Sequence, residues 1–176
     1  MRKISVLQKL NRNGIVAVIR GSSKENAMEI AESCISGGIY SIEIAYTTPQ
    51  ATEVIREISD RYFDDSNVVI GAGTVLDSVT ARLAIDSGSQ FVVSPSFDHT
   101  VAEMCNLYRI PYMPGCITVS EMQEALKHGV DVIKLFPGDS LEPSYIKAVK
   151  APLPQLNIMP TGGVNLENLD EWFKNG

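Results

Sequence analysis

Val132-Ile133-Lys134-Leu135-Phe136 is the stretch that decides the fold, because it places one lysine inside an otherwise apolar run. Ser41-Ile42-Glu43-Ile44-Ala45 repeats the pattern with a carboxylate in place of the amine. Successive side chains of a strand point to opposite faces, so the aliphatic flanks share one face and the charge lies on the other. Both stretches therefore predict strands with one apolar face and one face that carries a charged group.

Short β-branched runs recur along the chain, each followed by a turn-forming residue and a helical stretch. The expected strands are Ile15–Ile19, Tyr40–Ala45, Val68–Gly71, Phe91–Ser94, Pro111–Met113, Val132–Phe136 and Asn157–Met159. The expected helices are a short leading one around Ile4–Leu10, then Lys24–Ser36, Gln50–Tyr62, Val79–Ser87, Thr100–Tyr108, Ser120–Lys127, Ser144–Val149 and Leu166–Lys174. Strand alternating with helix indicates βαβ units and a parallel sheet.

Two parallel architectures accommodate these strands, an open doubly wound sheet and a closed barrel. In the open sheet helices cover both faces, so Glu43 and Lys134 would both lie beneath helices. In a barrel the aliphatic flanks meet the outer helices and the charges point toward the axis. We therefore expect an α/β fold of the TIM (β/α)8 barrel type, as a single domain over residues 1–176 with a short N-terminal helix.

The expected strands are one short of eight. Their starts recur about every 24 residues from Gly14 to Asn157, so an eighth would begin at or beyond Gly176. We expect the barrel to be truncated before the eighth strand and the natural protein to continue for roughly 25–40 residues. That tail would bring a Gly/Ser-bearing loop opposite Gly162-Gly163. Direct pairing of the seventh strand with the first would contradict this expectation.

Composition excludes several classes of function. The 176 residues carry 15 Lys+Arg and 21 Asp+Glu, a net charge of −6, whereas nucleic-acid binding needs a basic surface. No apolar run approaches the ~18 residues that cross a membrane. The cysteines Cys34, Cys105 and Cys116 form neither a disulfide framework nor a CxxC pair, so we expect a cytoplasmic protein.

Lys134 is the candidate nucleophile. Burial disfavours the ammonium form, and a neutral amine attacks a carbonyl to give an imine. Glu43 faces the same axis from another strand, where a carboxylate can pass protons during that chemistry. Two structural alternatives stay open: Lys134 reaching solvent past Pro137, and Glu43 in a buried ion pair that only fixes packing.

Two glycine-bearing segments are candidate ligand loops. Thr161-Gly162-Gly163-Val164-Asn165 follows the seventh expected strand and opens a helix, which favours a bound phosphate. A plain tight turn with Asn165 as the helix N-cap is the alternative. Gly71-Ala72-Gly73-Thr74 follows the third expected strand and places the Thr74 hydroxyl at the barrel mouth, although it lacks the full dinucleotide fingerprint.

Three further features lie at expected strand ends. Ser94-Pro95-Ser96 and Pro114-Gly115 are expected to end the fourth and fifth strands, either shaping the mouth or serving as simple turns. Arg20 ends the first strand and is either a cation for an anionic substrate or a solvated loop charge.

His99 and His128 fall on expected helices without matching ligands, so we expect two surface residues. Cys116 lacks a base partner and is expected to be structural. We therefore predict no metal site.

Six motifs in order carry a family resemblance. They are IEIAYTTP at Ile42–Pro49, GAGTVLD at Gly71–Asp77, FVVSPSFD at Phe91–Asp98, MPGCITVSE at Met113–Glu121, VIKLFPGD at Val132–Asp139 and PTGGVNLENL at Pro160–Leu169. From Gly14 to Gly176 the chain resembles the 2-keto-3-deoxy-6-phosphogluconate aldolases, also called 4-hydroxy-2-oxoglutarate aldolases.

The resemblance implies a homotrimeric class I aldolase with an eight-stranded barrel and neither metal nor cofactor. It implies cleavage of a phosphorylated 2-keto-3-deoxy sugar acid, or of 4-hydroxy-2-oxoglutarate, to pyruvate and glyceraldehyde 3-phosphate or glyoxylate. Lys134 matches the imine-forming lysine and Glu43 the general acid/base. Thr74 matches a residue that holds the pyruvyl carboxylate, and Gly162-Gly163 the phosphate loop.

One departure concerns the substrate. Many members have an arginine four residues after the glutamate, where this chain has Thr47; Arg20 resembles an arginine of the sister group that acts on 2-keto-3-deoxy-6-phosphogalactonate. The expected substrate-binding residues are Arg20, Thr47, Thr74, Pro95, Phe136, Thr161, Gly162 and Gly163. Two other functions stay open: a phosphosugar isomerase or epimerase that uses Lys134 and Glu43 without an imine, and a non-catalytic trimeric barrel.

Overall fold

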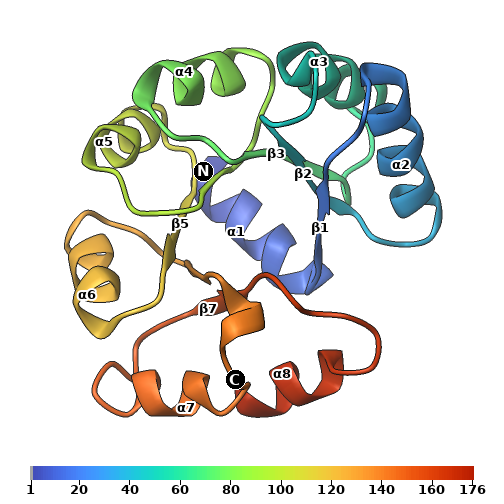
Figure 1. Cartoon of the computed structure of the whole chain (residues 1–176). Coiled ribbons are helices and arrows are strands. Elements are labelled where there is room, and N and C mark those ends of the chain that lie inside the picture. Colours follow the sequence, from blue (N-terminus) through green and yellow to red (C-terminus); the bar gives the residue numbers. More distant parts are fainter. Residues whose placement is uncertain (1) are drawn as a thin grey trace.

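The computed structural model describes residues 2–176, in which strands and helices alternate along the chain (Figure 1). The strands are β1 (Val16–Ile19), β2 (Ser41–Ala45), β3 (Val69–Gly73), β4 (Val92–Ser94), β5 (Tyr112–Cys116), β6 (Ile133–Leu135) and β7 (Ile158–Pro160). The helices are α1 (Arg2–Asn13), α2 (Lys24–Ser36), α3 (Ala51–Arg61), α4 (Ser78–Asp86), α5 (His99–Tyr108), α6 (Val119–Lys127), the 3-10 helix η1 (Gly138–Ser140), α7 (Tyr145–Lys150) and α8 (Leu169–Asn175). Between residues 2 and 176, no helix has the length and apolar character that crossing a bilayer requires.

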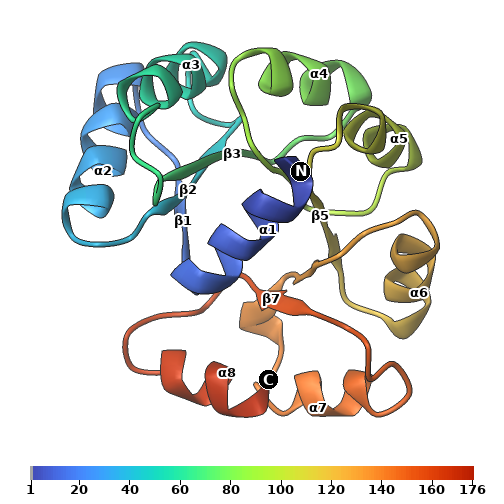
Figure 2. The same ribbon diagram turned by 180° about the vertical axis from the view of Figure 1, so that it is seen from behind.

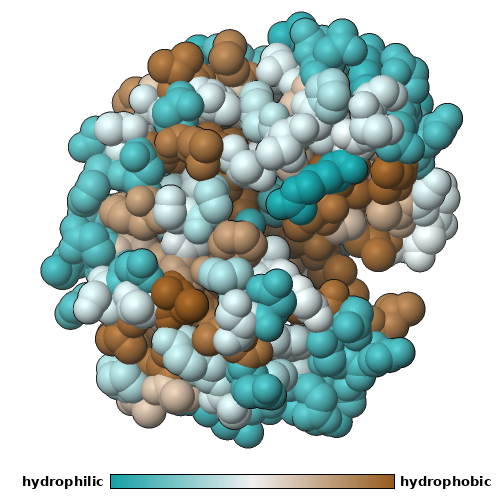
Figure 3. All heavy atoms as spheres, viewed as in Figure 1, coloured by the Kyte–Doolittle hydropathy of each residue, from teal (hydrophilic) through white to brown (hydrophobic). Residues whose placement is uncertain are grey.

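The seven strands form one parallel sheet in the order β1-β2-β3-β4-β5-β6-β7. The sheet curls so that helices α2 to α8 lie around its outside, which confirms the TIM-like α/β fold (Figure 1). Within residues 2–176 no pairing joins β7 to β1, so these strands do not close into a seven-stranded barrel. Figure 3 shows an indentation, partly lined by apolar residues, between the parts of the surface that contain α2 and α8.

Two apolar clusters confirm the predicted alternation along the strands. Ile42 and Ile44 of β2 belong to the large cluster between sheet and helices, together with Ile133 and Leu135 of β6. The inner cluster fills the curled sheet instead. Its buried members are Val6, Val69, Phe91, Val93 and Met113. Because the flanks of Glu43 and Lys134 face the helices, both charged side chains face the interior.

Helix α1 closes the end of the barrel at which the strands begin. Its side chain Val6 is buried in the inner cluster, and Leu10 packs against that cluster. Figure 2 shows α1 lying across this end, with the strands behind it. The predicted leading helix is confirmed, and it seals the interior on the side opposite the strand C-termini.

Two glycine-containing segments were expected to follow or end strands but lie inside them. Gly71 and Gly73 belong to β3, and Pro114 and Gly115 belong to β5. A Cβ on Gly71 would lie 2.4 Å from the Phe91 ring, and one on Gly115 would lie 2.0 Å from the Pro95 carbonyl oxygen. Both glycines are therefore required by close packing inside the barrel. Pro114-Gly115 lies within β5, so its interpretation as a turn that ends the strand is wrong.

The last helix begins later than expected. Helix α8 starts at Leu169 after Asn168, whereas Asn165 accepts backbone N–H bonds from Glu167 and Asn168 in a turn. Asn165 is therefore not the N-cap, and Gly162-Gly163 does not stand at a helix N-terminus. Helix α2 has its expected bounds, and the remaining helix boundaries differ from the expected ones by a few residues at most, as element ends commonly do.

Candidate active site

Glu43 and Lys134 are both buried inside the curled sheet. Glu43 is 0% exposed and Lys134 is 3% exposed, so the interpretation of Lys134 as a lysine that reaches solvent is wrong. Each has a glycine as a register partner on the neighbouring strand, Gly71 for Glu43 and Gly115 for Lys134. Because these two glycines have no side chain, the interior has room for the Glu43 carboxylate and the Lys134 amine.

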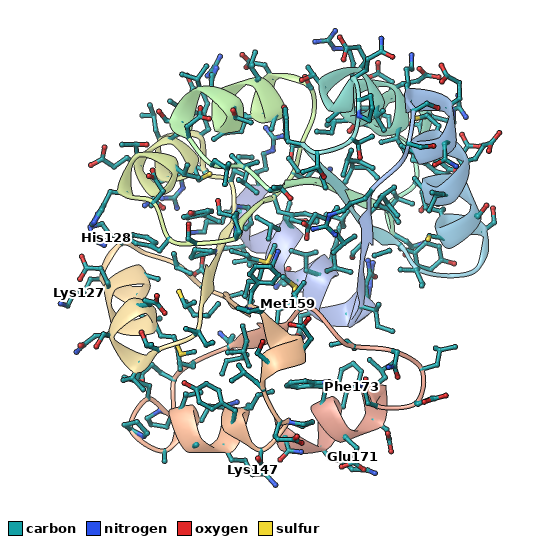
Figure 4. All side chains as sticks on the ribbon, viewed as in Figure 1. Lys127, His128, Lys147, Met159, Glu171 and Phe173 are labelled. Atoms are coloured by element: carbon teal, nitrogen blue, oxygen red, sulfur yellow. The ribbon has the colours of Figure 1, made fainter. Side chains whose placement is uncertain are left out.

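The second register partner of Lys134 is Met159 of β7. Figure 4 labels Met159 near the middle of the view, inside the ring of helices. The Lys134 Nζ also lies 4.8 Å above the centre of the Phe136 ring, a cation–π distance. The expected site residue Phe136 is therefore in contact range of the amine.

The Glu43 carboxylate has no partner inside the protein. Both of its oxygens are buried without a hydrogen bond to any residue among 2–176. A buried carboxylate costs free energy unless it is paired or protonated. Because Lys134 does not satisfy it, the two groups do not form the closed ion pair that was the structural alternative, and Glu43 is free to exchange protons with a ligand or water.

Burial favours the uncharged forms of both Glu43 and Lys134 by shifting their pKa values. Burial raises the pKa of Glu43, while the charges of Lys134 and Arg20 pull it back down. Burial lowers the pKa of Lys134 from 10.5; Glu43 opposes this and Arg20 reinforces it. The site therefore favours a neutral amine beside a carboxyl group that holds its proton more readily, as nucleophilic and acid–base catalysis require.

Thr74 follows β3 at the mouth and has a strained backbone. Its φ of 57° is left-handed, which is unfavourable for a β-branched residue. The preceding Gly73 packs against Glu43, since a Cβ there would lie 1.8 Å from Oε1. Thr74 therefore directly follows the glycine that packs against Glu43, and its role in holding a pyruvyl carboxylate stays a prediction.

The loops after β6 and β7 are joined by backbone hydrogen bonds. The Thr161 N–H donates to the Leu135 carbonyl at 3.0 Å, and the Gly138 N–H donates to the Thr161 carbonyl at 2.8 Å. Gly162 and Gly163 have φ values of 94° and 70°, which favour glycine. The loop is therefore held beside the strand that carries Lys134.

The loops after β1 and β2 are tied together by a residue that the sequence analysis did not single out. The buried Thr48 hydroxyl accepts the Gly21 N–H at 3.2 Å. Its neighbours Arg20 and Thr47 are exposed beside this link. Arg20 acts electrostatically on both Glu43 and Lys134, which fits a cation at the mouth.

The remaining expected site residue, Pro95, packs its carbonyl against Gly115, the register partner of Lys134. Cys116 is 2% exposed, and burial raises the pKa of its thiol to about 12, which fits the predicted structural role. His99 is exposed and His128 half-buried, as expected of surface residues, but their rings are in contact, with His99 Nδ1 3.0 Å from His128 Nε2.

Comparison with known proteins agrees with this geometry. The profile of the family described as "Aldolase: KDPG and KHG aldolase" matches residues 6–176. A 2-dehydro-3-deoxy-phosphogluconate aldolase of Treponema pallidum (strain Nichols) is 35% identical over 96% of this chain and 80% of its own length. A 2-dehydro-3-deoxy-6-phosphogalactonate aldolase of Escherichia coli (strain K12) is 34% identical over 92% of this chain and 78% of its own length.

Two solved structures share the fold. A native KDPGal structure superposes with a TM-score of 0.85 at 34% identity, over 92% of this chain and 78% of that one. A KDPG aldolase from Legionella pneumophila, with pyruvate captured at low pH as a covalent carbinolamine intermediate, gives a TM-score of 0.78 at 30% identity, over 90% of this chain and 75% of that one. Together with the family match, these similarities show that the chain belongs to the KDPG and KHG aldolase family of class I lyases.

Proposed function

We propose that this protein is a Schiff-base aldolase that cleaves a 2-keto-3-deoxy sugar acid carrying a phosphate, or 4-hydroxy-2-oxoglutarate, into pyruvate and an aldehyde. The observation that carries the proposal is the buried Lys134 amine on the same interior face as the unpartnered Glu43 carboxylate. A family member captured with pyruvate as a carbinolamine supports a covalent route.

Imine formation is the first half of the proposed reaction. The neutral Nζ of Lys134 attacks the substrate C2 carbonyl, and the carbonyl oxygen takes a proton to give a carbinolamine. Glu43, whose raised pKa lets it hold a proton, donates toward the C2 hydroxyl, which leaves as water. The product is an iminium at C2, which draws electrons from the adjacent carbon chain.

Carbon–carbon cleavage is the second half. The Glu43 carboxylate takes the proton of the C4 hydroxyl, directly or through one water, and the electron pair of the broken O–H bond forms the second bond of the aldehyde carbonyl. The C3–C4 bonding pair moves into the iminium and gives an enamine. Glu43 returns the proton to C3. Water then hydrolyses the pyruvyl iminium, which releases pyruvate and neutral Lys134 and gives the remaining proton back to Glu43.

Substrate choice is the finer part of the proposal. The backbone N–H groups around Gly162-Gly163 would hold a phosphate. Many family members have an arginine at the position of Thr47, and in this chain Arg20 would instead bind the substrate carboxylate. Relatives named for the gluconate and the galactonate acids are nearly equally similar to this chain. Arg20 favours the phosphogalactonate compound as the better substrate, because the sister group carries the comparable arginine.

The test is a substrate panel read out as pyruvate. The purified protein is given each of the two phosphorylated acids and 4-hydroxy-2-oxoglutarate, and pyruvate is measured with lactate dehydrogenase. Cleavage of at least one compound supports the proposal. Rearranged sugar acid without pyruvate would establish the isomerase or epimerase alternative, and no turnover on any compound would favour a non-catalytic barrel.

We also propose a homotrimer in the cytoplasm, as the resemblance implies. Exposed apolar side chains at Leu76, Val79 and Leu83, around the start of α4, provide a surface suited to subunit contact. Light scattering on the eluting protein measures the subunit number, and a monomer would contradict the trimer.

A further inference from the structure

The two histidines of the chain meet between neighbouring helices. His99 is the first residue of α5 and His128 directly follows α6, yet His99 Nδ1 lies 3.0 Å from His128 Nε2. Glu124 lies one turn before His128 on α6. One carboxylate oxygen of Glu124 and one ring nitrogen of each histidine lie within 4.8 Å of one another, the one such group of three found within residues 2–176.

The His128 ring is held with its Nε2 lone pair toward His99. Its Nδ1 lies 2.9 Å from the Glu124 backbone carbonyl, which can only accept, so Nδ1 carries the proton. The backbone carbonyl of His128 in turn accepts a hydrogen bond from the Asn106 side chain of α5 at 2.9 Å. A ring N–H bound to a carbonyl is the usual second contact of a metal-binding histidine.

His99 is also positioned by its neighbours. The Asp98 side chain caps α5 by accepting the Val101 N–H at 2.9 Å, which makes His99 the first helical residue. The Phe97 ring packs against both imidazoles, with ring centres 4.9 Å from His99 and 5.2 Å from His128. The two imidazoles therefore share an aromatic support and converge before any ion arrives.

We propose that His99, Glu124 and His128 form a binding site for a divalent transition-metal ion of the zinc class. With Zn–N bonds of ~2.0 Å, tetrahedral coordination separates two ring nitrogens by about 3.3 Å, so the observed 3.0 Å needs only a small opening. The partly exposed Glu124 carboxylate, whose Oε1 lies 3.6 Å from His128 Nδ1, would rotate toward the ion to supply the third ligand, and solvent would supply the fourth. Figure 4 shows His128 at the edge of the molecule where α5 and α6 adjoin, and its side chain is 31% exposed.

Binding requires one proton to move. In the absence of metal, His99 Nδ1–H donates to the lone pair on His128 Nε2, because His128 Nδ1 already holds its own proton. When the ion binds, the proton on His99 leaves Nδ1, and solvent returns one to Nε2. Both rings then coordinate as neutral imidazoles without a net change in protonation.

The ion would join the start of α5 to the end of α6. Because it binds the folded chain, zinc at one hundredfold above its dissociation constant should raise the Tm by about 5–10 °C. The site shares no residue with the Lys134–Glu43 interior, so the inference does not depend on the aldolase proposal.

The test uses tag-free protein and Zn²⁺, followed by calorimetric titration and by NMR of the histidine rings. We expect one zinc per chain, binding at least about tenfold weaker in both His99→Gln and His128→Gln, and transfer of the His99 proton from Nδ1 to Nε2 in the wild type. Glu103→Gln, a matched exposed carboxylate on α5, should bind zinc as the wild type does.

Three results would overturn the proposal. The first is wild-type protein without saturable zinc binding at one ion per chain. The second is unchanged affinity in both histidine variants. The third is loss of binding in Cys34→Ser, which would assign the zinc to the half-buried free thiol. The Tm without zinc shows whether the histidine variants are folded, and the rise in Tm on adding zinc gives a second reading of affinity.

Discussion

Gly73→Ala tests whether the position of the Glu43 carboxylate matters to the reaction. The new Cβ would lie 1.8 Å from Glu43 Oε1 and 2.5 Å from Cδ. To reach ordinary contact at 3.4 Å, Oε1 must retreat by about 1.6 Å within a site that is fully buried. A displacement of ~1 Å in a catalytic group can reduce the rate ~10²-fold, so we expect kcat to fall by at least about that factor.

The Gly73→Ala experiment reports kcat, KM and Tm together. Overpacking costs ~1–3 kcal/mol, so the Tm should fall by several degrees while the protein stays folded. Gly37→Ala is the matched control, because a Cβ at this α2 C-cap meets carbonyl oxygens no closer than 3.3 Å. Wild-type kcat in a folded Gly73→Ala protein would refute the role assigned to the Glu43 position.

Four further changes test the separate parts of the site. Lys134→Arg keeps the charge but removes the usable amine, so turnover should fall by several orders of magnitude; activity above a few per cent of wild type would exclude Lys134 as the nucleophile. Glu43→Gln should slow cleavage ~10²–10⁴-fold, and normal exchange of the pyruvate methyl protons would contradict the relay. The rate of imine formation should rise with pH and level off below 10.5, because burial lowers the pKa of Lys134. Glu43 raises that pKa, so Glu43→Gln should move the rise in rate to lower pH. An unchanged pH profile would show that the two groups do not interact. Arg20→Gln should raise KM for the phosphorylated acids with a smaller effect on kcat, and an unchanged KM would make Arg20 a solvated loop charge.

Alternation along the strands was the part of the fold that the sequence could predict. Lone charges between aliphatic residues in β2 and β6 placed Glu43 and Lys134 on the interior face because strand periodicity is local. The same locality let the capped helix α2 be predicted with its observed bounds, Lys24–Ser36. Both predictions depend on neighbours within a few residues, which a single sequence contains.

Contacts between distant residues account for what the sequence could not predict. Gly71 and Gly115 resemble turn residues, but Phe91 and the Pro95 carbonyl occupy the space that their side chains would need. Those neighbours come from another strand and its loop, so no local pattern distinguishes such a glycine from a turn. The missing hydrogen bonds of Glu43 are likewise a property of the packed interior.

The histidines show the same limit at the surface. His99 and His128 are 29 positions apart, so no short sequence spacing links the two rings, although Glu124 lies four residues before His128. They meet because adjacent βα units bring the first turn of α5 beside the end of α6. A prediction of two separate surface residues was the natural result of examining each helix alone.

The central claim is that Lys134 forms an imine with a 2-keto acid. The most direct measurement is borohydride reduction in the presence of pyruvate, followed by intact mass spectrometry and peptide mapping. The account predicts one reduced pyruvyl group per chain, located on Lys134 and absent from Lys134→Arg. No adduct, or an adduct on a different lysine that persists in Lys134→Arg, would contradict it.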